Sequence, residues 1–122
     1  MDDVTLEFEN ALESLEDSRI ALNNERFKNS INRSYYAVFH AAKALLLKKG
    51  IITHKHDSTI QQFGLHYVVN DNFDKNIAKI INRLEEDRTE SDYSISSYFD
   101  YEDAEYNLEK AELFIDECMQ FL

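Results

Sequence analysis

A column of polar side chains along one predicted helix holds the residues best suited to chemistry. Arg33 and His40 are seven residues apart, two helical turns, or about 10 Å along the axis. A guanidinium matches phosphate oxygens and stays charged, while an imidazole exchanges protons near neutral pH. This pair could cleave RNA without a metal, with His40 as acid or base and Arg33 stabilising charge on phosphorus. The column, at steps of four, three, four and three, is Asn29, Arg33, Tyr36, His40 and Lys43.

The same spacing also fits solvated or locally paired residues of an ordinary helix, so by itself it is a weak motif. Tyr36 is expected half-buried at a subunit contact beside the pair, where packing is a commoner role than base stacking. His54 and His56, with His40, suggest zinc, but no cysteine or paired carboxylate is spaced to complete a tetrahedral site. We therefore predict no metal and no cofactor. We expect one of these two loop histidines, His54 or His56, to place positive charge near the Arg33–His40 groove.

The elements that position these residues are predicted to be helices. The chain has no proline and two glycines among 122 residues, too few turn formers for a many-stranded protein. Apolar residues recur at steps of three and four. Val4, Phe8, Leu12, Leu15 and Leu22 mark such a stripe in the first helix. The predicted helices span about 3–23, about 25–49, a third from after Asp57 or Ser58 to the turn at 70–72, about 73–90 and about 99–121.

These patterns predict an all-α fold, an up-and-down antiparallel bundle of about five helices in a single domain over residues 1–122. We expect Gly50 to end the second helix in a left-handed conformation. The polar segment 91–97 is expected to be an ordered loop, anchored by Tyr93 and Ile95. Arg88 and Asp92 are expected to form an ion pair at its start.

Composition limits the classes of function. The net charge of −11 repels nucleic acid at long range, so any RNA site must be locally basic or completed by a partner. Cys118 is the single cysteine, which excludes an internal disulfide and favours a reducing, cytoplasmic location. No apolar run approaches the length of a membrane span.

Residues 32–46 resemble the signature helix of the HEPN family (higher eukaryotes and prokaryotes nucleotide-binding), with a Tyr-Tyr-Ala-x-Phe-His-Ala core at 35–41. The similarity continues at Thr53-His54, at residues 63–68 and at residues 88–93, and spans about 5–120. It implies a helical bundle that forms a homodimer, with an Arg-x6-His motif facing the partner. Many members are metal-independent RNases, often toxins paired with a nucleotidyltransferase antitoxin. By motif position, Arg33 and His40 are the catalytic pair.

The resemblance also suggests the residues that bind substrate, although strongly nucleolytic members often carry Asn, Asp or His where this chain has Ser34. The expected substrate-binding residues are Asn29, Ser34, Tyr36, Lys43 and His54. Two functions compete: a toxin-like RNase that works by 2′-hydroxyl attack, and a non-catalytic nucleotide-binding or partner subunit of a nucleotidyltransferase. A plain helical scaffold ranks third. The second helix looks apolar on more than one side, which favours a dimer through it, with Ala37 expected at the contact.

Overall fold

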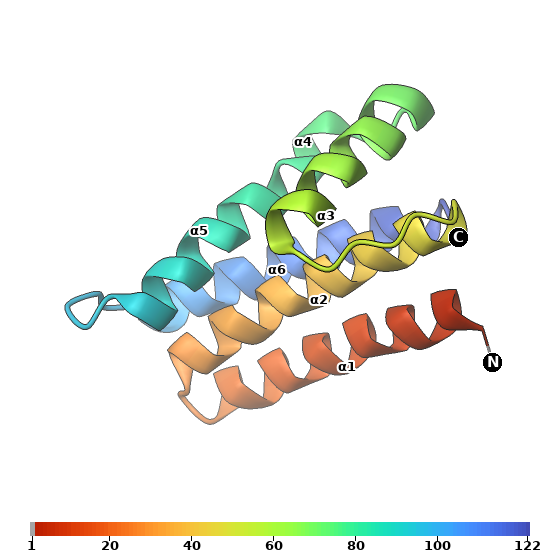
Figure 1. The fold of residues 1–122 in the computed structure, drawn as a ribbon. Helices are drawn as coiled ribbons and strands as arrows, with labels where there is room; N and C mark the ends of the chain where they lie inside the picture. Colours follow the sequence, from red (N-terminus) through yellow and green to blue (C-terminus); the bar gives the residue numbers. More distant parts are fainter. Residues whose placement is uncertain (1) are drawn as a thin grey trace.

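The computed structural model describes residues 2–122, which fold into a bundle of helices with no strand in that range (Figure 1). The elements are α1 (Asp3–Asn23), α2 (Phe27–Lys48), α3 (His56–Phe63), the π-helix η1 (Gly64–Val69), α4 (Lys75–Ala78), α5 (Ile80–Tyr93) and α6 (Tyr101–Met119). Because η1 continues α3 and only Lys79 separates α4 from α5, the described residues form five helical segments, as predicted. No helix in this part of the chain is long and apolar enough to cross a membrane.

The helix that carries the polar column, α2, lies at the centre of the molecule. In Figure 1 it runs between α1 and the arm formed by α3, α4 and α5, with α6 behind it. Its apolar residues are therefore covered from several sides within one chain. Ala37 is fully buried in this core. The apolar surplus of α2 thus needs no second subunit, and the expectation that Ala37 lies at a dimer contact is wrong.

Small side chains bring α1 close to α2. Ala11, Ser14, Ser18 and Ala21 are buried on the α1 side, and they let the two backbones approach. The Ser18 hydroxyl bonds to the Ser34 hydroxyl at 2.8 Å and to the Ser30 carbonyl oxygen at 2.8 Å. Leu12, which we expected in the apolar stripe, is 40% exposed because the small residues occupy the contact face instead.

The turns follow the predicted signals in part. The α1–α2 turn uses Glu25 at φ 60, and Gly50 ends α2 at φ 76, as expected for a left-handed cap. The third helix begins earlier than predicted, at His56, after an N-cap residue whose side chain makes no capping bond. The fourth is also displaced: Asp74 caps α4 through the backbone amides of Asn76 and Ile77, and α5 extends to Tyr93.

The loop between α5 and α6 is held by polar bonds instead of the apolar anchors we expected. Tyr93 is 77% exposed and Ile95 is fully exposed, so that prediction is wrong. The Ser97 hydroxyl donates to the Glu90 carbonyl oxygen at 3.2 Å, and a capping box closes the start of α6. The predicted Arg88–Asp92 ion pair is present, at 3.5 Å. Cys118 is buried, and burial raises the pKa of its thiol.

Candidate functional site

A half-exposed strip on α2 brings the predicted catalytic pair together around one aromatic ring. The Arg33 guanidinium carbon lies 4.9 Å from the centre of the Tyr36 ring. The centres of the Tyr36 and His40 rings are 6.2 Å apart. Since both groups contact one side chain, they lie on one face of the helix, as the four-and-three spacing predicted. We call the residues Arg33, Tyr36, His40 and Lys43 the α2 strip.

His40 is held by a carboxylate from another helix. Its Nδ1 lies 2.7 Å from Oε1 of Glu7 on α1. Both side chains are only partly accessible, at 26% for His40 and 15% for Glu7. A carboxylate accepts but cannot donate when it is ionised, so the bond places a proton on Nδ1 and fixes the plane of the ring. This leaves Nε2 as the nitrogen for proton exchange.

Arg33 is held by a chain of polar bonds that reaches α5. Its Nε and Nη2 donate to Oδ1 of Asn32, at 3.0 and 2.7 Å. The amide of Asn32 donates in turn to the Asp92 carboxylate, at 3.1 Å, and Asp92 pairs with Arg88. Nη1 is the guanidinium nitrogen that the bond to Asn32 does not use.

An aromatic wall borders the strip on the side of α3 and α5. His56, the first residue of α3, lies with Nδ1 2.7 Å from the Tyr35 hydroxyl and stacks on Phe39 with ring centres 4.6 Å apart. Its ring also meets Tyr36 edge-on at 5.7 Å. Burial, together with the nearby Glu85 carboxylate, raises the pKa of Tyr35. Tyr35 therefore stays a neutral phenol and belongs to the core.

Arg88 forms the base of this wall. Its guanidinium carbon lies 5.0 Å from the centre of the Tyr35 ring and 5.9 Å from that of Tyr36. Burial alone would lower the pKa of Arg88, but its hydrogen bond to Glu85, at 2.9 Å, raises it overall. A cation that stays charged here packs against both tyrosine rings and holds them in place.

The other predicted substrate-binding residues differ in how close they lie to the α2 strip and in whether they are accessible. Asn29 is exposed one turn before Arg33, and Lys43 is half-buried one turn after His40. His54 is exposed in the loop after α2, and it is His56 that contacts the aromatic residues of α2. Ser34 is fully buried and bonded to Ser18. Substrate contact through Ser34 does not fit that position.

Reasoning from the sequence missed two contributors, Glu7 and Asn32, and it chose His54 instead of His56 as a substrate-binding residue. Glu7 had a signal, because it stands at steps of four and three from the small residues that face α2. That series is Glu7, Ala11, Ser14, Ser18 and Ala21. Asn32 had none, since its partner Asp92 lies 60 residues away in the chain.

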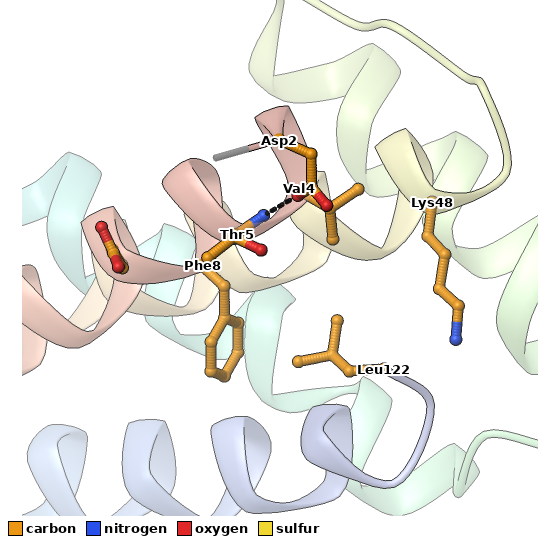
Figure 2. Close-up of a pocket in the computed structure, with 7 residues that line it drawn as sticks. Asp2, Val4, Thr5, Phe8, Lys48 and Leu122 are labelled. Atoms are coloured by element: carbon orange, nitrogen blue, oxygen red, sulfur yellow. Dashed lines mark hydrogen bonds between the residues drawn. The ribbon is translucent and has the colours of Figure 1, made fainter.

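A separate cavity of about 470 Å³ lies at the N-terminal end of α1 and contains none of the predicted site residues (Figure 2). Val4, Phe8 and Leu122 form its apolar wall. Two of its polar groups are already engaged: Asp2 accepts from the Thr5 amide, and Lys48 donates to the Phe121 carbonyl oxygen. Among the described residues no group of three or more His, Cys, Asp or Glu side chains is arranged to hold a metal ion.

The bundle is shared with a solved protein of Thermus thermophilus, TT1696. The two structures match with a TM-score of 0.82 over 100% of both chains, at 16% sequence identity. This likeness defines the class of fold, an all-α bundle built around one central helix. The sequence then gives the family: the HEPN domain matches residues 5–121, and the protein belongs to the HEPN domain family.

Relatives with curated names support the same assignment. A "UPF0332 protein" of Thermotoga maritima is 37% identical over 106 residues, which cover 87% of this chain and 80% of the relative. A protein of Methanocaldococcus jannaschii named "Putative toxin MJ0605" is 34% identical over 112 residues, 92% of this chain and 83% of the relative. The protein is thus a HEPN domain protein related to proteins that carry a toxin name.

Proposed function

We propose that this protein is a metal-independent endoribonuclease of the toxin type, which acts as a homodimer. One observation carries the proposal: Arg33 and His40 flank the same half-exposed ring, that of Tyr36, on the surface of the central helix. The family and the toxin-named relatives support the class of activity. The bond from Glu7 gives His40 the form that an acid–base catalyst needs.

The chemistry follows from the groups in the strip. The 2′-hydroxyl of a ribose attacks the adjacent phosphorus, the bond from phosphorus to the 5′-oxygen breaks, and the products are a 2′,3′-cyclic phosphate and a 5′-hydroxyl. His40 Nε2 accepts the 2′-hydroxyl proton or supplies one to the leaving oxygen. Arg33 Nη1 stabilises the charge that builds on the phosphate oxygens.

A dimer through the α2 strip would complete this scheme. One imidazole cannot act as base and as acid in the same step, but an isologous contact doubles every residue near the two-fold axis. Two Arg33–His40 sets would then face one phosphate, with one histidine in each role. A toxin also requires an antitoxin, and a nucleotidyltransferase is the partner that the family suggests.

The direct test is cleavage of varied single-stranded RNAs by the purified protein in EDTA. We expect wild type to cleave, and His40→Ala to lose about 100-fold or more in rate, the usual contribution of general acid–base catalysis. His66→Ala is the matched control, because His66 lies on η1, away from the strip.

If wild type cleaves RNA no better than His40→Ala, the proposed ribonuclease activity is refuted. If the protein does not cleave RNA but a nucleotide raises its melting temperature, a second candidate function replaces the ribonuclease. That candidate is a non-catalytic partner subunit of a nucleotidyltransferase, and the net charge of −11 favours it, because so acidic a surface is unusual for a protein that binds long RNA on its own.

A further inference from the structure

We propose that the surface beside the first two turns of α2 is a binding track for the phosphates of single-stranded RNA, and that it leads to Arg33. This inference rests on the proposed function and names how an acidic chain captures its substrate. The track is formed by two adjoining cavities around Arg26, Lys28, Asn29 and Arg33.

The two cavities adjoin, because they share lining residues. The first, of about 360 Å³, lies between the end of α1 and the start of α2, and Arg33 is part of its lining. The second, of about 370 Å³, lies at the start of α2 and has Lys28, Phe27 and Phe99 in its lining. Arg26 and Asn29 line both. The track therefore extends outward from the predicted catalytic arginine.

The cations of this track have no carboxylate partner among the described residues, whereas four other cations are paired with one. Arg19, Lys49, Arg83 and Arg88 each pair with a carboxylate within 4.0 Å. Within residues 2–122, Arg26, Lys28 and Arg33 make no such pair. One carboxylate, Asp17, lines the first cavity and none lines the second. The track is thus a local basic surface on a chain of charge −11.

The chain has a second basic groove, with which the proposed RNA-binding track can be compared. It lies between α4, α5 and α6, has a volume of about 330 Å³ and is lined by Lys79, Arg83 and Lys110. Arg83 there pairs with Asp87 at 3.6 Å, and the lining contains no residue of the α2 strip. Lys79 and Lys110 consequently supply a matched control with the same charge as Arg26 and Lys28.

The geometry suits a strand that passes over more than one nucleotide. Arg33 comes seven residues after Arg26, about 10 Å along a helix, so the two guanidinium groups reach different phosphates of one backbone. Arg26 and Lys28 are exposed and bind by charge, without reading the bases. Arg33 at the inner end then holds the phosphate that is cleaved.

The experiment measures RNA binding in the His40→Ala background, where cleavage cannot interfere. The probe is a fluorescently labelled single-stranded RNA of about a dozen nucleotides, and its anisotropy is titrated at several salt concentrations. We expect the double variant Arg26→Gln, Lys28→Gln to bind roughly ten-fold more weakly, and its salt dependence to be shallower by about 1.4 in log–log slope, as expected when two phosphate contacts are lost. The double variant Lys79→Gln, Lys110→Gln has the same net charge and should bind within about two-fold of its parent.

Three results would be decisive. Equal weakening in both double variants would overturn the track and show general charge repulsion, while EDTA-resistant cleavage that depends on His40 would still support the ribonuclease. Selective weakening without any cleavage by wild type would support the track and remove the ribonuclease. Absence of RNA binding by the parent would overturn the track, and cleavage by wild type in EDTA would then decide separately whether the ribonuclease remains. Thermal melting of each variant verifies that it is folded.

Discussion

At the scale of single residues, the carboxylate of Glu7 matters most for the proposed chemistry. The α2 strip alone supplies an imidazole whose tautomer and orientation are open. Glu7, from α1, sets both through its 2.7 Å contact with Nδ1. Glu7 touches His40 and no other group proposed to react, so it is a positioning residue.

Glu7→Gln should lower kcat about ten- to a hundred-fold and leave KM nearly unchanged, because an amide can donate to Nδ1 and favour the wrong tautomer. The pH profile of kcat should also change, which a purely structural role would not cause. Glu9→Gln is the control, since Glu9 is an exposed carboxylate of the same helix. Equal kcat values and pH profiles for Glu7→Gln and Glu9→Gln would contradict the positioning role.

Helical periodicity was enough to predict that Arg33, Tyr36 and His40 share a face. Such spacing is a local property and survives packing. It could not predict what each residue meets in the folded chain. Ser34 belongs to the same stretch of sequence, yet it turns inward to Ser18, and His56 takes the place that we had predicted for His54. Contacts between helices decide these cases.

At the scale of elements, the prediction succeeded where a helix is long and amphipathic. The first helix has its predicted bounds, 3–23. The third and fourth segments were less accurate, because a π-helix interrupts one and a turn at Lys79 interrupts the other. The π-helix begins at Gly64, but one glycine does not predict a π-helix, and the sequence around Lys79 contains neither glycine nor proline. A tertiary contact of Tyr67 stabilises the π-helix.

Tyr67 on η1 donates its hydroxyl to the carbonyl oxygen of Leu45. This carbonyl is one of the last four of α2, which have no partner within the helix. Tyr67 is 2% exposed, so the phenol supplies a buried cap that fixes the end of the central helix. The ammonium group of Lys49 lies over the same ring at 4.2 Å.

Tyr67→Phe should lower the free energy of unfolding by about 1–3 kcal/mol at neutral pH, because it leaves a buried carbonyl unsatisfied. Burial raises the pKa of Tyr67 from 10 to about 12. The stabilisation that the Tyr67 hydroxyl contributes to the fold is therefore fully present below pH 10. It is lost as the pH rises from 10 to 12. The difference between wild type and variant should shrink across that interval in urea titrations. The control is Tyr98→Phe, at an 83% exposed position, which should leave the free energy of unfolding unchanged. If the stability difference between wild type and Tyr67→Phe does not vary with pH, this account is contradicted.

At the scale of the whole molecule, the core gives no reason for a dimer, since α1, α3, α5 and α6 already cover α2. The reason must come from the strip that remains half-exposed. This strip is bordered by Glu7 of α1 on one side and by His56 and Arg88 on the other. Tyr36 lies at its centre. A contact between two copies through Tyr36 would set both Arg33–His40 pairs around one axis.

Tyr36→Glu should convert a dimer into monomers, because a carboxylate at the centre of an isologous contact faces its own copy and the two charges repel. Mass in solution, from sedimentation or light scattering, checks this, and RNA cleavage should be lost in the same variant. Tyr98→Glu makes the same change in charge at an exposed site outside the strip and should remain dimeric and active. If Tyr36→Glu stays dimeric, the subunits meet elsewhere. If wild type is monomeric and still cleaves, one Arg33–His40 set must supply both the acid and the base, and the paired mechanism fails.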